Sequence, residues 1–364
     1  MTNNSISKQG LLFKSLLAVA LVATFSNDIQ AQAQAEPVTA ERLPASMGAI
    51  GDSMTAGALA MFKRQNFVLP WTELVVAIRA MAYGLTSNLS TIEARKLSWS
   101  SGYDTKGRVE SHAYRISKIQ DLKQSIPSYN AAVTGAESGD IQSQVDRMNQ
   151  WSIKTVNKQF PDYVTLMIGP NDACANSPEE MVDTNTYYSN VVKIVDEMLA
   201  KSPDTKIVVG SIPNIELLRT VAKDARLYWG VKCEALWKKA NLCPTLTTLS
   251  DPYQRAIVGN RIKDYNNALQ EIVESRRASV GDRIRFAPQT FQEVFSADEL
   301  SIDCFHPNTR GQQRVANATW DASWWTKEWK VKKADLVEKA RKEKEAHCQT
   351  LDYSGKTPRR WPGC

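Results

Sequence analysis

Residues 47–57 read MGAIGDSMTAG, a short apolar run that passes directly into a polar turn. Four further apolar runs also end in turns, at residues 129–133, 163–168, 206–209 and 284–286. Runs of this length that are bounded by turn residues are typical of buried strands. Their recurrence along the chain predicts a sheet.

Longer stretches with helical periodicity lie between or after these runs, at residues 141–151, 187–199, 264–274 and 311–325. Alternation of strands and helices favours a parallel sheet that is covered by helices on both faces. In such sheets a ligand site forms beyond the carboxyl ends of the strands. The sequence thus predicts an α/β fold whose site lies in the turns that follow the strands.

The 364 residues, 43% of them hydrophobic, can bury a substantial core. One main domain is expected over residues 40–330, with a helical excursion within residues 59–115 and a basic helical extension at residues 331–364. Residues 1–35 have the lysines, the short apolar stretch and the AQAQA run of a secretory signal peptide. The mature protein is expected to begin near Glu36 and to be secreted or periplasmic.

Six cysteines form an even set that could make three disulfides in an oxidising compartment. Sequence alone allows fifteen connectivities. Cys233 with Cys243 and Cys348 with Cys364 would close short loops, which would leave Cys174 to meet Cys304. The alternative is that some cysteines are buried free thiols. The chain has no Cys-x-x-Cys or His-Glu-x-x-His motif, so no metal site is expected.

The formal net charge of +6 owes much to the tail at residues 327–360. A basic face there could favour transient contact with anionic lipid surfaces. The alternative is a solvated helix with Glu-to-Lys pairs at helical spacing. Nucleic acid is not an expected partner because the chain has no aromatic-basic module.

Residues 51–53, GDS, and 303–306, DCFH, carry the parts of an activated nucleophile. A hydroxyl attacks near neutral pH only when an imidazole takes its proton and a carboxylate orients that imidazole. Ser53, His306 and Asp303 can supply these parts as catalytic residues. Taken singly, Ser53 is more often a helix cap and His306 an ordinary loop histidine.

Two further turns offer donors for the negative oxygen of a tetrahedral intermediate. Asn171 follows the apolar run at residues 163–168, and Gly135 follows the run at residues 129–133. With the backbone N–H of Ser53 they would make a three-donor oxyanion hole. The alternatives are a turn asparagine and a glycine at positive φ.

These motifs together resemble the SGNH or GDSL hydrolase family, over residues 47–307. The resemblance implies a three-layer α/β/α flavodoxin-like fold with a central, mostly parallel sheet. It also implies Ser53 as nucleophile, Gly135 and Asn171 as oxyanion donors, and Asp303 and His306 as orienting group and base. No metal, nucleotide or organic cofactor is implied.

A narrower likeness is to the phospholipase B branch of that family, which implies phospholipid or lysophospholipid substrates. It is carried by residues 51–57, 96–102, 130–135 and 303–306. Pro170 stands where the branch usually has glycine, and residues 101–103 break its usual glycine pair, so the substrate is less certain than the chemistry.

Lipid acyl chains would need an apolar trough beside Ser53. Candidates from the nearby excursion, most of them expected in the core, are Leu59, Met61, Phe67, Val68, Leu69, Trp71 and Trp99. One alternative is an esterase for short-chain or acetylated carbohydrate esters. Another, from a different class, is a catalytically inactive secreted binding protein on a hydrolase scaffold. The tryptophans at positions 320, 324, 325 and 329 fit packing against the sheet better than contact with lipid.

Overall fold

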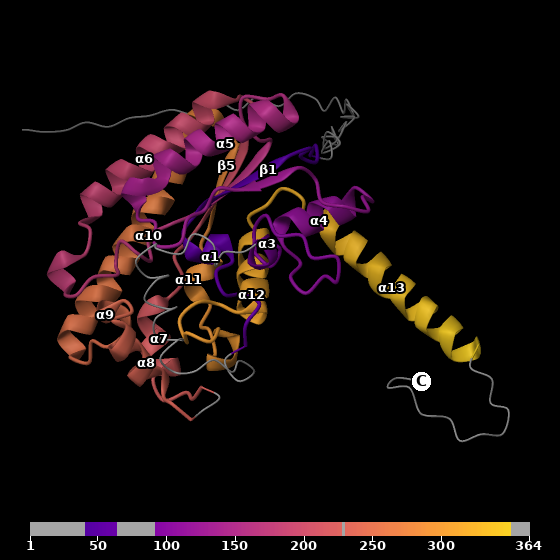
Figure 1. The fold of residues 1–364 in the computed structure, drawn as a ribbon. Coiled ribbons are helices and arrows are strands. Elements are labelled where there is room, and N and C mark those ends of the chain that lie inside the picture. The colour runs from indigo at the N-terminus through magenta and orange to yellow at the C-terminus, as the bar shows by residue number, and fades with distance from the viewer. Residues whose placement is uncertain (1–40, 64–91, 228–229, 351–364) are drawn as a thin grey trace, which may run out of the picture. The chain divides into compact units, whose positions relative to one another are not determined.

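The computed structural model describes residues 41–63, 92–227 and 230–350. The expected signal peptide, residues 64–91 of the predicted excursion and Cys364 lie outside these residues. The strands are β1 (Met47–Gly51), β2 (Ser128–Asn130), β3 (Tyr163–Met167), β4 (Lys206–Gly210) and β5 (Ile284–Ala287). They form one sheet in the order β2-β1-β3-β4-β5, and every pairing is parallel (Figure 1).

The α-helices connect and flank these strands. They are α1 (Ser53–Ala56), α3 (Ile92–Arg95), α4 (His112–Ile119), α5 (Ile141–Val156), α6 (Thr184–Lys201), α7 (Leu218–Ala222), α8 (Cys233–Ala240), α9 (Pro244–Thr247), α10 (Pro252–Val280), α11 (Gln289–Gln292), α12 (Thr309–Trp320) and α13 (Thr326–Thr350). Short 3-10 turns are η1 (Ser138–Asp140), η2 (Pro178–Glu180), η3 (Ile215–Leu217) and η4 (Ala297–Glu299).

Alternate residues of the strands point to opposite faces and enter different cores. Val164 and Leu166 of β3 pack in the same cluster as apolar residues of α5, α6 and α10. Tyr163 and Met167 of the same strand pack on the other face, with residues of α4 and α12. Helices therefore cover both faces of a parallel sheet, and the predicted three-layer α/β/α fold is confirmed.

Two helices differ from their predicted extent. The pattern at residues 264–274 covers only part of α10, which begins at Pro252 with Asp251 as its N-cap. The helix predicted at residues 311–325 ends at Trp320, and α13 begins at Thr326. Trp325 and Trp329 are nonetheless buried in the same cluster as Trp320, so these tryptophans belong to the core, as expected.

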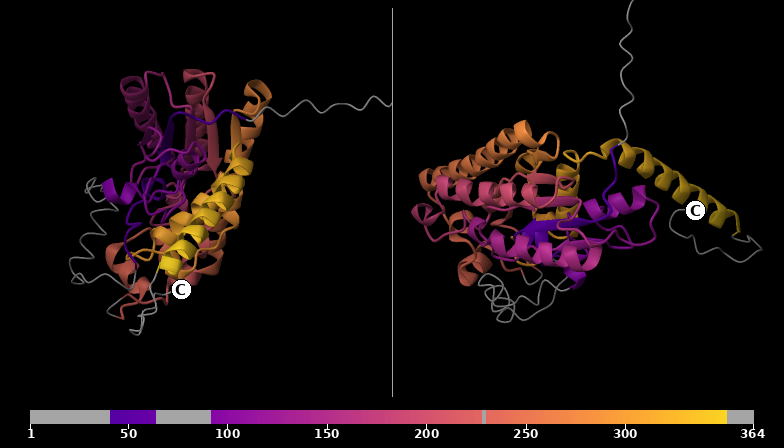
Figure 2. Two further views of the ribbon diagram at one scale, coloured as in Figure 1. Left: turned by 90° about the vertical axis from the view of Figure 1, so that its right-hand side faces the viewer. Right: turned by 90° about the horizontal axis from the view of Figure 1, so that it is seen from above.

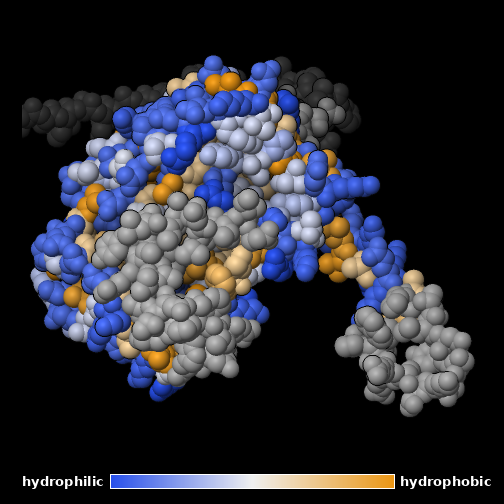
Figure 3. All heavy atoms as spheres, viewed as in Figure 1, coloured by the Kyte–Doolittle hydropathy of each residue, from blue (hydrophilic) through white to orange (hydrophobic). Residues whose placement is uncertain are grey.

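The C-terminal helix α13 packs beside α4 at its start and then extends away from the sheet (Figures 1 and 2). Lys332 and Lys333 pair with Asp121 and Glu110. Farther along, Arg341 pairs with acidic side chains of its own helix, and hydrophilic and hydrophobic side chains alternate on the visible face (Figure 3). Among the described residues, no helix is long and apolar enough to cross a membrane.

A buried glutamine fixes the end of β1, where the polar turn begins. The side chain of Gln144 accepts from Gly51 N at 2.9 Å and donates to Gly51 O at 2.9 Å. The side chain of Gln144 is itself fully buried. Gln144 therefore holds the backbone immediately before Asp52 and Ser53.

We expect Gln144→Leu to lower the free energy of unfolding by about 1–3 kcal/mol, because the buried N–H of Gly51 loses its acceptor. Denaturant unfolding would measure the change. Gln150→Leu, at an exposed position of the same helix, is the matched control. Equal stability of the two variants would contradict this role for Gln144.

Candidate active site

The predicted site residues all follow strand ends on one edge of the sheet. Ser53 begins α1 directly after β1, and the side chain of Asp52 caps this helix by accepting from Met54 N at 2.8 Å. Gly135 lies beyond β2 and Asn171 beyond β3, which are the neighbours of β1 in the sheet. The sequence therefore delivers these three residues to adjacent loops.

Asp303 and His306 come from the loop that precedes α12. The Nδ1 atom of His306 lies 2.5 Å from Oδ2 of Asp303. The other carboxylate oxygen accepts from the backbone N–H groups of Phe305 and His306, both at 3.0 Å. Asn308 caps α12 by accepting from Arg310 N and Gly311 N, which ends the loop just after His306.

One cavity of about 230 Å³ brings all five predicted residues together. Its lining includes Ser53, Gly135, Asn171, Asp303 and His306. With Nδ1 of His306 engaged by Asp303, the Nε2 atom is the ring nitrogen left to act on a hydroxyl. A hydroxyl, an imidazole and a carboxylate therefore meet at one surface hollow, which suits acyl transfer.

The electrostatics of this cavity favour a basic imidazole. Burial opposes the charged form of His306, but the negative charges of Asp303 and then Asp52 outweigh it and raise the pKa of His306. Burial also raises the pKa of Asp52 to about 7, against the lowering effects of Met54 N and His306. Asp52 is a buried acid beside the nucleophile position whose influence on His306 the sequence analysis did not identify.

The loops of Gly135 and Asn171 are tied to each other. The Nδ2 group of Asn171 donates to Ala136 O at 2.9 Å, and it has a second N–H available. Asp172 accepts from the backbone N–H and the hydroxyl of Ser138. Gly135 has φ 83°, a left-handed conformation that favours glycine. These contacts fix the two candidate oxyanion donors relative to one another.

Two of the three expected disulfide pairs, Cys233–Cys243 and Cys174–Cys304, are wrong. The bridges are Cys174–Cys243 and Cys233–Cys304, with Cα–Cα distances of 4.8 and 5.8 Å. Cys233 is the first residue of α8 and Cys243 lies beyond the end of that helix, so the helix separates the two cysteines and each pairs with a different loop. The third expected pair includes Cys364, which lies outside the described residues.

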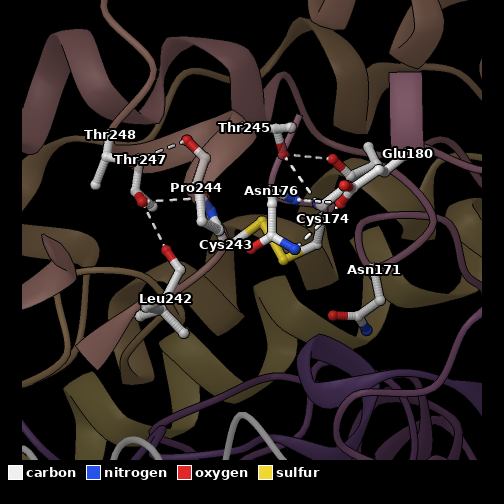
Figure 4. The surroundings of a disulfide bond; sticks show 12 residues. Asn171, Cys174, Asn176, Glu180, Leu242, Cys243, Pro244, Thr245, Thr247 and Thr248 are labelled. Atoms are coloured by element: carbon white, nitrogen blue, oxygen red, sulfur yellow. Dashed lines mark hydrogen bonds between the residues drawn. A yellow bond between two sulfur atoms is a disulfide. The ribbon is translucent and has the colours of Figure 1, made fainter. Parts of the chain in front are cut away.

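Both bridges fasten the segment 233–243 to loops of the site. Cys243 and Cys174 line the main cavity together with Asn171 (Figure 4). Beside this bridge, Thr245 donates to Ala173 O at 2.6 Å and accepts from Ala175 N at 3.2 Å. No sequence pattern marks the segment 233–243 as a wall of the site, because only the cysteine pairing places it there.

The other bridge supports the loop that carries Asp303 and His306. Cys304 lies between Asp303 and His306 and is bonded to Cys233, the first residue of α8. The indole Nε1 of Trp237, also in α8, donates to Asp303 O at 3.1 Å. The backbone that carries Asp303 is thus held by a covalent bond and by a buried hydrogen bond.

The predicted apolar trough is tested only in part. Leu59 and Trp99 are buried in the core, and the candidates at residues 67–71 lie outside the described residues. A second cavity, lined mainly by apolar side chains, adjoins Ser53 and His306. Among the described residues, its apolar walls come from residues 215–221 and 294–300.

Comparison with known proteins agrees with this architecture. A model of the GDSL-like lipase/acylhydrolase family matches residues 49–314. Membrane-associated phospholipase B1 of Rattus norvegicus is 25% identical over 315 residues and that of Homo sapiens 24% identical over 317 residues. Each alignment covers 78% of this chain and 20% of the relative, so the chain spans one fifth of the length of these curated relatives.

Solved structures with a similar fold include two carbohydrate esterases. An acetylxylan esterase from Geobacillus stearothermophilus has 16% identity and a TM-score of 0.37, over 77% of this chain and 95% of that chain. A family 3 carbohydrate esterase from Clostridium thermocellum has 16% identity and a TM-score of 0.37, over 76% and 94%. Since the family model spans the chain from β1 into α12 and includes every predicted site residue, this protein belongs to the GDSL-like lipase/acylhydrolase family of ester hydrolases.

Proposed function

We propose that this chain hydrolyses carboxylic esters through an acyl-enzyme formed on Ser53. The observation that most directly supports this proposal is the pairing of His306 Nδ1 with Asp303 in the cavity that Ser53 also lines. His306 takes the proton of Ser53 as the hydroxyl oxygen attacks the ester carbonyl, and passes it to the leaving alcohol. Water, activated by the same imidazole, then releases the acid.

The backbone N–H of Ser53, the N–H of Gly135 and the side chain of Asn171 serve in this proposal as donors to the developing oxyanion. Their loops converge on one cavity, and such donors stabilise the charge that appears only in the transition state. Ester hydrolysis of this kind needs no metal or organic cofactor.

Phospholipid and lysophospholipid acyl esters are the first candidate substrates. The curated relatives bear the name phospholipase B1 and are described as membrane-associated. The phospholipase B-like motifs of the sequence, above all the run at residues 96–102, support the same choice. Transient contact of α13 with a lipid surface is part of this proposal.

Esters of short acyl groups, including acetylated carbohydrates, are the second candidate. The observation that favours them is the small size, about 40 Å³, of the apolar cavity beside Ser53. Such a cavity suits a short chain better than the acyl chain of a membrane lipid.

Covalent capture and a substrate panel test this function. A fluorophosphonate probe is expected to label the peptide that contains Ser53, as mass spectrometry of the digested protein would show. The panel compares release of acid from phosphatidylcholine, lysophosphatidylcholine and acetylated xylan. Labelling elsewhere, or no hydrolysis of any ester in the panel or of p-nitrophenyl butyrate, would reject the proposal. Release from xylan alone would select the second candidate.

Asn171→Ala is expected to lower kcat by about a hundredfold to a thousandfold with little change in KM, since the lost amide acts on the transition state. Steady-state kinetics on p-nitrophenyl butyrate would measure the effect. Asn176→Ala is the matched control, because Asn176 lines the same cavity but donates to Glu180. A kcat for Asn171→Ala equal to that of the control would exclude the oxyanion role.

The proposal also includes export of the protein from the cytoplasm. Residues 1–35 act as the signal peptide, residues 40–330 form the hydrolase domain and residues 331–364 form the basic extension. The helix α13 crosses the last boundary without a break. The two described disulfides suit an oxidising compartment such as the periplasm or the exterior.

A further inference from the structure

Two cavities of different character meet at the same side chains. Ser53, Asn171, Phe305 and His306 line both of them. The first has a volume of about 230 Å³ and contains polar groups such as those of Asn241. The second is about 40 Å³ and is walled mainly by aliphatic and aromatic side chains. An ester bound at Ser53 thus has a roomier side with mixed polar and apolar walls and a narrow, apolar side.

The walls of the second cavity come from two connections. Ile215, Leu217, Leu218 and Val221 belong to η3 and α7, which follow β4. Phe295 and Leu300 flank η4, which precedes the loop of Asp303. Leu218 and Leu300 are almost fully buried in one cluster, against which Val221 and Phe295 pack while half-buried. These two connections meet over Ser53 and leave an apolar recess.

We infer that the acyl group of the ester occupies the second cavity and the alcohol occupies the first, with Val221 as a determinant of acyl-chain length. An acyl chain is thin and apolar, so it gains from leaving water for this recess. The alcohol part of a phospholipid or a sugar ester is bulky and polar, and fits only the larger hollow. This assignment rests on the ester hydrolysis proposed above and names the position of each half of the substrate.

The size of the recess limits the chain. One water-sized group needs roughly 10–15 Å³, so a cavity of about 40 Å³ accepts a chain of about three or four carbon atoms. Longer chains must displace the η3–α7 wall or remain in water. A recess of this size therefore favours the second candidate substrates named above, esters of short acyl groups, over the long-chain lipid esters.

Val221 is the wall residue best suited to a test. It is half-buried, so its replacement disturbs the fold less than replacement of Leu218, which is 7% exposed. Val221→Ala enlarges the recess and Val221→Phe fills it. Val192→Ala is the matched control, because Val192 is also a half-buried helical valine but lies in α6, outside the lining of both cavities.

The experiment measures kcat/KM for p-nitrophenyl acetate, butyrate, hexanoate and octanoate with each full-length variant. The wild type is expected to be most active on butyrate and at least about tenfold less active on octanoate. Val221→Ala should move the maximum to hexanoate or octanoate. Val221→Phe should lower the butyrate-to-acetate ratio by about tenfold or more, the scale on which apolar pockets discriminate a methylene group. Ratios between esters within one preparation are independent of the fraction of folded protein.

Two results would overturn this inference. One is a wild-type maximum at octanoate. The other is an unchanged chain-length profile in both Val221 variants, as in Val192→Ala. Either result, combined with an inactive Ser53→Ala protein, would remove the cavity assignment but leave the proposed function intact. Full hydrolysis by Ser53→Ala would instead remove the proposed function itself.

Discussion

The Ser53→Ala protein is expected to lose about a millionfold in kcat on p-nitrophenyl butyrate, the scale seen when the nucleophile of a serine hydrolase is removed. A methyl group cannot attack the carbonyl or form the acyl-enzyme. The other side chains that line the two cavities beside Ser53 are unchanged, so the ester should still bind and KM should change little. Initial rates at high enzyme concentration, with substrate turnover in buffer subtracted, would measure the loss.

Ser152→Ala is the matched control for this variant. Ser152 is fully buried in α5, and its hydroxyl has no hydrogen-bond partner within the described part of the chain. Its loss should leave the rate unchanged. Retention of the wild-type rate by Ser53→Ala, in a protein that the fluorophosphonate probe no longer labels, would show that hydrolysis proceeds by another route.

Asp303→Asn is expected to lower kcat by about ten-thousandfold. The backbone N–H groups of Phe305 and His306 would keep the asparagine oxygen as their acceptor, in place of the carboxylate oxygen that they now engage. The amide nitrogen would then face His306 and force its Nδ1 atom to accept. The proton of the ring would move to Nε2, which could no longer act as a base toward Ser53.

The pH profile separates this effect from a simple loss of structure. The base is active when His306 is neutral, so kcat/KM falls as pH drops through the pKa of His306. Burial lowers that pKa, but Asp303 and Asp52 raise it above the ordinary value. Removing the charge of Asp303 should therefore move the acid limb of the profile to lower pH. Asp264→Asn, at an exposed position of α10, should leave the limb in place, and an unmoved limb in Asp303→Asn would contradict the pairing.

The sheet and the site segments were predictable because both depend on local sequence. Five apolar runs gave five strands, since each run is short, apolar and bounded by turn residues. The order of the strands then brought Ser53, Gly135 and Asn171 to adjacent loops. Their catalytic roles remain predictions that the substitutions above test.

Features that depend on distant packing were not predictable. The helical pattern at residues 311–325 did not reveal that the helix ends at Trp320. Trp325 continues the apolar pattern, but it is buried by tertiary packing beyond the end of α12. The cysteine pairing follows from the position of α8, which no local pattern specifies. The apolar recess beside Ser53 is built by η3, α7 and η4, each too short to stand out in the sequence.

The two disulfides that hold the segment 233–243 have a practical consequence for recombinant production. The two bridges span 69 and 71 residues of chain, and closure of loops of that length stabilises a folded protein by about 4 kcal/mol each in the chain-entropy model. Protein made in a reducing bacterial cytosol would lack both cross-links and give preparations of low specific activity. Expression strains with an oxidising cytosol, or refolding with a glutathione pair, should yield the competent enzyme.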